Sequence, residues 1–514
     1  MNKQINFNKL NKIKIPNYLN NYLVKNTIIL ILTSLLIKLL SLVNRIVITR
    51  LLGPEGISLY VLILPTIMLF CSISCFSLNV TMSKMVAENE KEKNYTHKQL
   101  IISGIKIGSI STIVTLIFFS IFINFISINL LKQKDSFLPL LCSFIMFPLT
   151  MFNSVYKGFF NGLDKIEISS KSSLFEQLPR IFFSFSLLIL FKNNSTTILV
   201  SISIIAMSFG ELISLLYNVY KYKVISKLYR GYNKVNNNIK NSNIKKNMFE
   251  MSLSQTLSHL ISNVSFFLEP IIYTYALGLI NINPDEAMYR YSEVNAYALP
   301  LLTMFMFTSS SIGTVIIPIL SKNNYNHKAK EISKISLILS LLPAVFLSVV
   351  LFFFGDKYMY LLYKSTIGST FVKKYSILFG IFYIQPILNS ILQAHGKQKK
   401  LFSFTVIASI CKLLTLFSLT FIKSISHQSL FFSIIVGNLL HTTILLIYVI
   451  KLLKLKFNYK NIIKLILIFI ITFYTFYIFH NLNINYIVSS FIGLIFFFIY
   501  LKISNFLSLI KNIY

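Results

Sequence analysis

Long apolar segments recur along the whole of this sequence, each about as long as a membrane is thick. A helix needs about 20 apolar residues to cross the hydrocarbon core of a bilayer. About fourteen segments meet that length, near residues 26–52, 56–80, 100–128, 135–156, 174–192, 196–219, 250–278, 292–320, 332–354, 370–393, 401–422, 428–452, 461–480 and 484–504. We therefore predict an all-α polytopic membrane protein.

Composition excludes several other classes of protein. The 514 residues are 55% hydrophobic and 13% charged, and 16 acidic side chains stand against 49 Lys and Arg, for a net charge of +33. The basic residues occupy short stretches between apolar segments, whereas a nucleic-acid-binding protein carries one basic face. The sequence lacks a phosphate loop, an HExxH motif and a GxSxG elbow. We predict no enzyme activity, no cofactor, no metal site and no nucleic-acid partner.

The basic connections predict the topology. Every second connection is rich in lysine, and Lys and Arg accumulate in cytoplasmic loops. Both termini are therefore expected in the cytoplasm, and the first segment has no cleavage site after it, so it should be retained as a helix. The longest basic connection follows the sixth segment and suggests a division into repeats. The predicted parts are a basic N-terminus (1–25), a first lobe (26–220), a basic linker (221–248), a second lobe (249–452), and a last helix pair with the C-terminus (453–514).

Ionisable residues inside the first predicted helix are candidates for a binding site, because a charge within the membrane is costly unless it faces a polar cavity or a partner. Lys38, Ser41 and Arg45 follow each other at helical spacing and would form one polar stripe. Only five arginines occur in the chain, so each suggests a need for a forked donor that is always charged. Arg50 near the end of the helix either serves the same purpose or extends to the lipid headgroups.

Two further positions combine a charge with a helix. Glu176 and Arg180 stand four residues apart, which allows an ion pair within one helix that serves either binding or neutralisation. Glu269 precedes Pro270, and a proline frees a backbone carbonyl inside a helix. Glu269 could bind a coupling proton or sodium ion, or it could pair with a lysine on a neighbouring helix.

A set of short motifs resembles the stage V sporulation protein B group of polysaccharide exporters, in the multidrug/oligosaccharidyl-lipid/polysaccharide (MOP) superfamily that also holds the MurJ and MATE proteins. The motifs occur in order along residues 26–400: NRIVITRLLGPEG (44–56), SKMVAE (83–88), GFFNG (158–162), Glu176-Gln177 with Arg180, FLEPI (267–271) and ILQA with Gly396-Lys397 (391–397). The resemblance implies fourteen helices in two six-helix lobes around a central cavity, plus a C-terminal helix pair, with alternating access. It also implies a lipid-linked glycan substrate that carries a diphosphate.

In MurJ-type flippases, cationic residues of the first lobe line the cavity. Lys38 lies where such a cation is expected, while Asn44 stands where MurJ proteins usually have a second arginine. We therefore expect Lys38, Arg45 and Arg180 to attract the diphosphate, with Arg50 and Lys84 at the two mouths. Glu176 and Glu269 are expected to serve in helix pairing or ion coupling.

These features lead to one main hypothesis and two alternatives. The chain is expected to be a flippase of the cytoplasmic membrane that moves a polyprenyl-diphosphate-linked precursor similar to lipid II, in spore cortex peptidoglycan synthesis. Its partners would be that anionic glycan lipid, the membrane lipids and possible cell-wall synthases, with coupling to a sodium gradient, a proton gradient or the membrane potential left open. The alternatives are a cation-coupled multidrug antiporter of the same superfamily and a wall-assembly scaffold that transports nothing.

Overall fold

A computed structural model describes residues 22–92, 95–228, 241–323, 326–422, 424–455 and 459–504, and these residues form helices without any β-strand. The α-helices are α1 (Tyr22–Cys75), α2 (Leu78–Glu92), α3 (His97–Phe125), α4 (Phe137–Cys142), α5 (Met146–Gly162), α6 (Ile166–Leu190), α7 (Thr196–Leu228), α8 (Asn241–Leu279), α9 (Pro284–Ser292), α10 (Leu299–Leu302), α11 (Met306–Asn323), α12 (His327–Tyr363), α13 (Ser369–Ile381), α14 (Gln385–Ala394), α15 (Gln398–Thr420), α16 (Ser429–Leu453), α17 (Tyr459–Asn481) and α18 (Tyr486–Ile503). The prediction of an all-α protein is confirmed.

Eleven helical stretches among the described residues are long and apolar enough to cross a membrane, or up to twelve if one bent pair forms a single span. Each of the fourteen predicted segments overlaps a helix. One of the eleven stretches, Leu35–Glu90, covers both of the first two predicted segments, and α8 is not among the eleven. The count of fourteen therefore stays a prediction, although the multi-pass character is clear.

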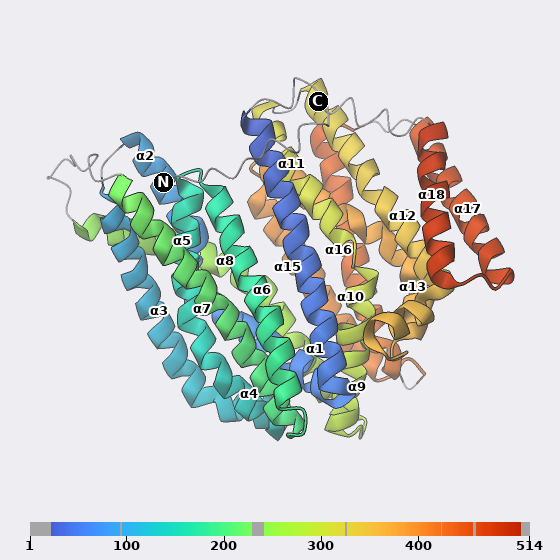
Figure 1. Ribbon diagram of the computed structural model, residues 1–514, viewed down its shortest axis with the longest axis horizontal. Coiled ribbons are helices and arrows are strands. Elements are labelled where there is room, and N and C mark those ends of the chain that lie inside the picture. Colours follow the sequence, from blue (N-terminus) through green and yellow to red (C-terminus); the bar gives the residue numbers. More distant parts are fainter. Residues whose placement is uncertain are drawn as a thin grey trace, which may run out of the picture.

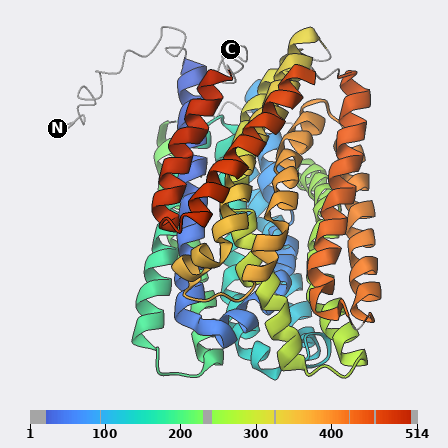
Figure 2. The ribbon, with the colours of Figure 1, turned by 90° about the vertical axis from the view of Figure 1, so that its right-hand side faces the viewer.

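The helices form two groups that lie side by side (Figure 1). Helices α2 to α7 belong to one group and α11 to α16 to the other, while α1 runs along the middle of the view. The last pair, α17 and α18, packs against α12 at the outer side of the second group (Figure 2). Helix α1 begins and α18 ends at the same end of the bundle.

Helix α1 is broken at Gly53, where the first predicted hairpin should turn. Gly53 has φ 67° and ψ −177°, a backbone conformation that residues with a β-carbon rarely adopt, and Pro54 follows it directly. The part of α1 before Gly53 therefore corresponds to the first predicted segment, and the part after it begins the second. This break determines where Arg50, less than one turn earlier, meets the other half of the molecule.

Helix α8 contacts both groups of helices. Its first turns carry Ile244 and Met248 into an apolar cluster with α2, α3 and α5, and Ser252 Oγ donates to Thr81 Oγ1 on α2 at 3.0 Å. Its later part packs against α15. Both α7, which continues to Leu228, and α8, which begins at Asn241, extend into the range 221–248 that we predicted as a linker. Residues 229–240 of that linker, the N-terminal stretch 1–21 and residues 505–514 lie outside the described residues.

Candidate functional site

Arg45 on α1 connects the two halves of the molecule. One terminal nitrogen of its guanidinium donates a hydrogen bond to the backbone carbonyl of Asn295, 250 residues further along the chain. Its Nε is buried and has no hydrogen-bond partner among the described residues. A backbone carbonyl is a neutral acceptor, and no carboxylate of the described residues forms an ion pair with this half-buried cation.

Arg50 makes a second contact of the same kind close to the end of the bundle where α1 turns. Its Nε donates to the carbonyl of Leu362 at 2.6 Å, and a terminal nitrogen donates to the carbonyl of Leu361. Helix α12 ends at Tyr363, so both carbonyls belong to its last turn, where backbone acceptors lack helical partners and cations are favoured. Arg50 is exposed. The sequence suggested a place in the polar binding stripe or an extension to the lipid headgroups, and it gave no indication of these two carbonyl partners.

Lys38 and Lys84 lie in more open surroundings than the arginines. Lys38 is exposed and has no hydrogen-bond or ion-pair partner within the described part of the chain. Ser41, one turn later on the predicted stripe, donates to the carbonyl of Ile37 on its own helix at 2.9 Å. The side chain of Lys84 is 62% exposed and lies 3.8 Å from Glu88 in a surface pair on α2.

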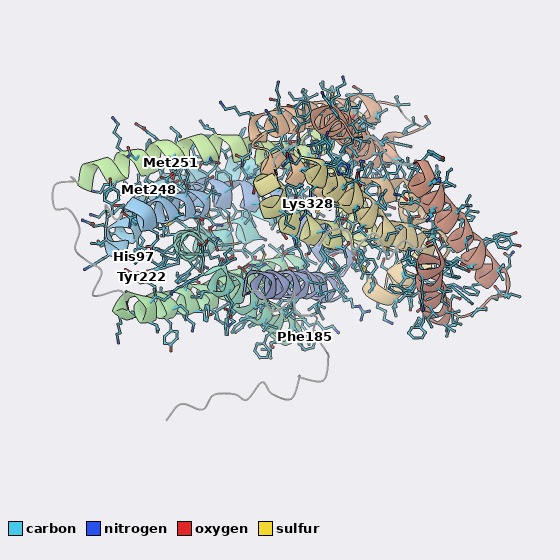
Figure 3. All side chains as sticks on the ribbon, turned by 90° about the horizontal axis from the view of Figure 1, so that it is seen from above. His97, Phe185, Tyr222, Met248, Met251 and Lys328 are labelled. Carbon is cyan, nitrogen blue, oxygen red and sulfur yellow. The ribbon has the colours of Figure 1, made fainter. Side chains whose placement is uncertain are left out.

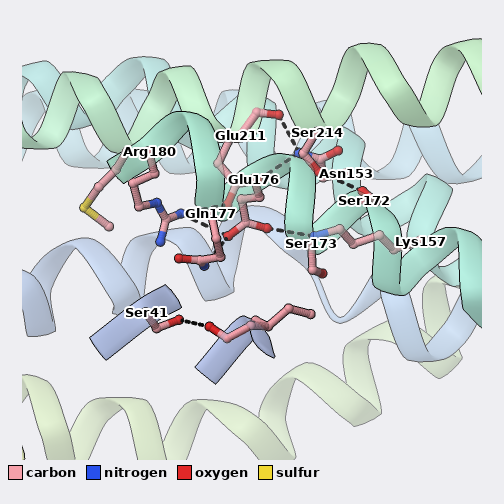
Figure 4. Close-up of polar contacts among 12 residues, drawn as sticks. Ser41, Asn153, Lys157, Ser172, Ser173, Glu176, Gln177, Arg180, Glu211 and Ser214 are labelled. Carbon is pink, nitrogen blue, oxygen red and sulfur yellow. Dashed lines mark hydrogen bonds and ion pairs between the residues drawn. The ribbon is translucent and has the colours of Figure 1, made fainter. Parts of the chain in front are cut away.

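Glu176 and Arg180 take part in a cluster of buried charges (Figure 4). The carboxylate of Glu176 accepts from Arg180 at 3.0 Å, which is the ion pair that their spacing suggested, and from Lys157 on α5 at 2.9 Å. Arg180 also lies 3.7 Å from Glu211 on α7. We call Lys157, Glu176, Arg180 and Glu211 the α5–α6–α7 cluster; its two cations and two carboxylates balance within one half of the molecule.

Amides and a close helix contact support this cluster. Asn153 Nδ2 donates at 2.8 Å both to the carboxylate and to the backbone carbonyl of Glu211, and Asn218 donates to Asn153 in turn at 2.8 Å. A β-carbon at Gly210 would lie 2.6 Å from the backbone oxygen of Glu176, so glycine allows α6 and α7 to approach at this level. The charges are therefore brought together by tight packing of three helices.

The α5–α6–α7 cluster lies next to the predicted polar stripe of α1, which contains Lys38, Ser41 and Arg45. Tyr60, buried on α1 beyond the break, interacts electrostatically with both Arg45 and Arg180. In Figure 4, Ser41 on α1 lies across from Gln177 and Arg180 on α6. Arg180 Nε, like Arg45 Nε, is buried without a hydrogen-bond partner in the described residues. Arg45 and Arg180, two of the predicted substrate-binding cations, thus both lie near the buried Tyr60, and each has an Nε without a hydrogen-bond partner in the described residues.

Glu269 on α8 is buried, with 2% of its surface exposed, and pairs with Lys412 on α15. The lysine partner on a neighbouring helix, one of the two alternatives from the sequence, is therefore present. Asn295 Nδ2 also donates to Glu269 at 3.2 Å. Asn295 lies in a π-helical stretch, Glu293–Ala298, and π-helical turns often occur at functional sites.

A chain of polar contacts consequently runs from α1 to α15. Arg45 donates to the backbone carbonyl of Asn295, the side chain of Asn295 donates to Glu269, and Glu269 pairs with Lys412. A β-carbon at Gly437 on α16 would lie 2.9 Å from Cβ of Lys412, so this glycine makes room for the lysine stem. We call these four polar residues the interhalf chain.

Several of these residues escaped the sequence reasoning. The sequence pattern did not single out Lys157, Glu211, Lys412 or Asn295. Lys412 could have been found, because it stands alone in the apolar segment 401–422. Within the described residues, no group of three or more His, Cys, Asp or Glu could hold a metal ion, and the four cysteines are free.

Comparisons with known proteins show the family and the fold. Residues 23–324 match the family model described as polysaccharide biosynthesis protein. Stage V sporulation protein B of Bacillus subtilis (strain 168) is 28% identical over 450 residues, which cover 85% of each chain. A solved structure of the lipid II flippase MurJ in an inward closed conformation gives a TM-score of 0.66 at 16% identity, over 92% of this chain and 98% of that one. An inward-facing multidrug resistance MATE family transporter of the MOP superfamily gives a TM-score of 0.55 at 14% identity, over 81% and 97%.

Proposed function

Because the chain belongs to the polysaccharide biosynthesis protein family, we propose that it is a flippase for a polyprenyl-diphosphate-linked cell-wall precursor similar to lipid II. It would move this lipid from the inner to the outer face of the cytoplasmic membrane, acting as a transporter and not as an enzyme. The likeness of its fold to a lipid II flippase and to a MATE transporter supports this assignment. The similarity to a stage V sporulation protein supports a role in spore cortex synthesis.

The observation that carries the proposal is the state of Arg45. This half-buried guanidinium donates to a neutral carbonyl across the two halves and keeps a buried, unpartnered Nε. Charge-assisted hydrogen bonds to phosphate are about twice as strong as bonds between neutral groups, and arginine can form two of them at once. A diphosphate would therefore displace the Asn295 carbonyl, with Lys38 as a further cation, whereas the charge of Arg180 is already balanced by Glu176 and Glu211.

The interhalf chain supplies a mechanism for alternating access. Release of Arg45 from Asn295 would remove a contact that joins α1 to the second half. Since Asn295 also donates to Glu269, a change in the charge around Glu269 would alter the position of the amide. We propose Glu269 as the coupling residue, with a proton, a sodium ion or the membrane potential as the driving force and Lys412 as its counter-charge. Arg50 and Lys84 would act at the outer and inner mouths.

The orientation follows from the distribution of lysine and from the common end of α1 and α18. Both termini and the linker 221–248 would lie in the cytoplasm, where basic loops are retained. The divisions proposed for the chain remain a first lobe (26–220), a second lobe (249–452) and a terminal pair (453–514). In this orientation Gly53 and Arg50 lie near the outer face.

The test is complementation in cells that are depleted of their lipid II flippase. We expect the wild-type chain and Lys223→Ala to restore growth and externally accessible lipid II, because Lys223 is an exposed residue of α7 outside the proposed site. Arg45→Ala should accumulate in the membrane and fail to restore either one. Rescue by Arg45→Ala at wild-type protein levels would contradict the assigned site.

The same flippase-depleted cells also test the two alternatives, a multidrug antiporter and a wall-assembly scaffold. Glu176 and Glu269 are both ion-paired, which leaves neither as an open carboxylate for a cationic drug. Drug resistance without accessible lipid II would nevertheless identify an antiporter. Loss of rescue on deletion of residues 229–240, together with full rescue by Arg45→Ala, would identify a scaffold that recruits cell-wall synthases.

A further inference from the structure

A groove between α3 and α8, away from the interhalf chain, combines lysines with apolar side chains. It has a volume of about 530 Å³, and its walls include Lys106 and Ile110 from α3 and Lys245, Lys246 and Phe249 from α8. None of the residues that line it is acidic. None of the three lysines has an ion-pair or hydrogen-bond partner within the described residues.

The packing of α3 explains why these residues face outward. A β-carbon at Gly104 would lie 2.9 Å from the sulfur of Met82, and one at Gly108 would lie 2.4 Å from the sulfur of Met151. The glycine face of α3 is therefore pressed against α2 and α5. Lys106 and Ile110, which are four residues apart, share another face, and Ile110 is 65% exposed.

The apolar surface of the groove continues along α3. Ile113, Val114, Ile117 and Phe118 are all more than half exposed and follow Ile110 at helical spacing. On α8, Phe249 is 49% exposed, and its ring centroid lies 5.5 Å from that of Phe76. The lysines consequently stand at the head of an exposed apolar track along α3.

We propose that this groove binds an anionic phospholipid of the leaflet next to the start of α8. The phosphate would lie among Lys106, Lys245 and Lys246, and one acyl chain would follow the exposed face of α3. Charge complementarity selects this occupant, because three cations without a carboxylate favour a net negative headgroup over a zwitterionic one. Such a lipid would tie α3 of the first half to α8.

Ordinary snorkelling of lysine to the headgroups makes a different prediction from a lipid site. Snorkelling needs no particular lipid and no shared groove. A site formed by two helices should enrich anionic lipid above its bulk fraction, and this enrichment should disappear when the lysines are removed together. The distinction can be measured because the chain contains no tryptophan.

The reporter is the full-length variant Phe249→Trp in phosphatidylcholine vesicles that contain a minor fraction of brominated phosphatidylglycerol. The control reporter is Phe185→Trp on α6, where Phe185 is 50% exposed and lies on the opposite side from Met248 and Met251 of α8 (Figure 3). Bromine quenches tryptophan only at close range, so quenching reports the local lipid. Vesicles with an equal fraction of brominated phosphatidylcholine give the reference value.

We expect quenching by brominated phosphatidylglycerol to exceed the phosphatidylcholine value by about threefold at Phe249→Trp, and to equal it at Phe185→Trp. The combined change Lys106→Ala, Lys245→Ala and Lys246→Ala should abolish the excess, whereas Lys223→Ala with Lys227→Ala on α7 should preserve it. Leu253→Trp, one turn further on α8, provides a second reporter. Equal quenching by both lipids at both α8 reporters, or an excess that survives the triple change, would overturn the proposal.

Discussion

Glu176 on α6 and Glu269 on α8 are carboxylates inside apolar helices, and each is bound by a lysine from a neighbouring helix. Glu269 is buried, and 13% of the Glu176 side chain is exposed. A glycine on an adjacent helix allows close packing at each carboxylate. Gly210 lies against the backbone of Glu176, and Gly437 lies against the side chain of Lys412. Their further contacts differ. The α5–α6–α7 cluster closes on itself, whereas Glu269 connects through Asn295 to Arg45 on α1.

This difference separates two uses of buried charge in one membrane protein. A balanced cluster within one half keeps its contacts when the halves move, so its free energy contributes to folding. A contact that joins the halves must break during alternating access, so its free energy sets the balance between conformations. Changes in the first cluster should therefore alter stability, and changes in the interhalf chain should alter transport.

The largest effect is expected for Glu176→Ala. It leaves Lys157 and Arg180 buried with Glu211 as their remaining counter-charge, and removing one partner of a buried pair costs about 3–5 kcal/mol of unfolding free energy. We expect little protein in the membrane and a lower unfolding temperature in detergent. Glu88→Ala, in the exposed pair with Lys84, should change neither measurement. Normal stability of Glu176→Ala with loss of flipping would place this cluster in the transport path instead.

An exchange of charges between Glu269 and Lys412 tests the role of the interhalf chain. Glu269→Lys and Lys412→Glu should each reduce the amount of folded protein, because each buries two like charges together. The double variant restores an ion pair and should restore the amount of protein. Flipping should stay at least about tenfold below wild type, since a lysine at position 269 cannot accept from the Asn295 amide. Restored flipping in the double variant would show that the pair serves stability alone.

The helices were predictable because the length of an apolar run is set by the membrane. The turn at Gly53 was predictable as well, since glycine followed by proline interrupts a helix. The break within the predicted segment 292–320 was not. There the chain passes through a π-helical stretch and then bends between Leu302 and Met306, whereas the two prolines of the segment are Pro300 and Pro318.

The site was predictable only where both partners lie on one helix. The spacing of Glu176 and Arg180 indicated their ion pair, because residues four apart meet on a helix surface. Lys157 and Lys412 reach their carboxylates from other helices. In helices that are apolar all round, the pattern of side chains does not indicate which face meets which neighbour. The carbonyl partners of Arg45 and Arg50 are invisible in sequence for the further reason that every residue has a carbonyl.

A moderate effect is expected for Asn295→Ala, which keeps the backbone carbonyl that binds Arg45 and removes the amide that donates to Glu269. A hydrogen bond to a charged group contributes about 1.5–3 kcal/mol, so flipping should fall by about tenfold with little change in stability. Asn263→Ala is the control, because Asn263 on α8 donates to the neutral Ser72 on α1 at 2.8 Å and not to Glu269. An equal loss in both variants would mean that the contact with Glu269 has no more influence on flipping than a contact between neutral side chains.

The smallest effect is expected for Arg50→Lys, which sharpens the contrast between the half-buried Arg45 and the exposed Arg50 on α1. Arg50 is exposed, and water can replace it at the carbonyls of Leu361 and Leu362. A cation at a helix C-terminus contributes about 0.3–1 kcal/mol, so flipping should stay within about threefold of wild type. Arg45→Lys loses the forked donor of a half-buried side chain and should reduce flipping at least as much as Asn295→Ala. Flipping by both variants is measured after reconstitution into vesicles. Equal effects of Arg50→Lys and Arg45→Lys would mean that exposure does not distinguish these arginines and that their two contacts open and close as one unit.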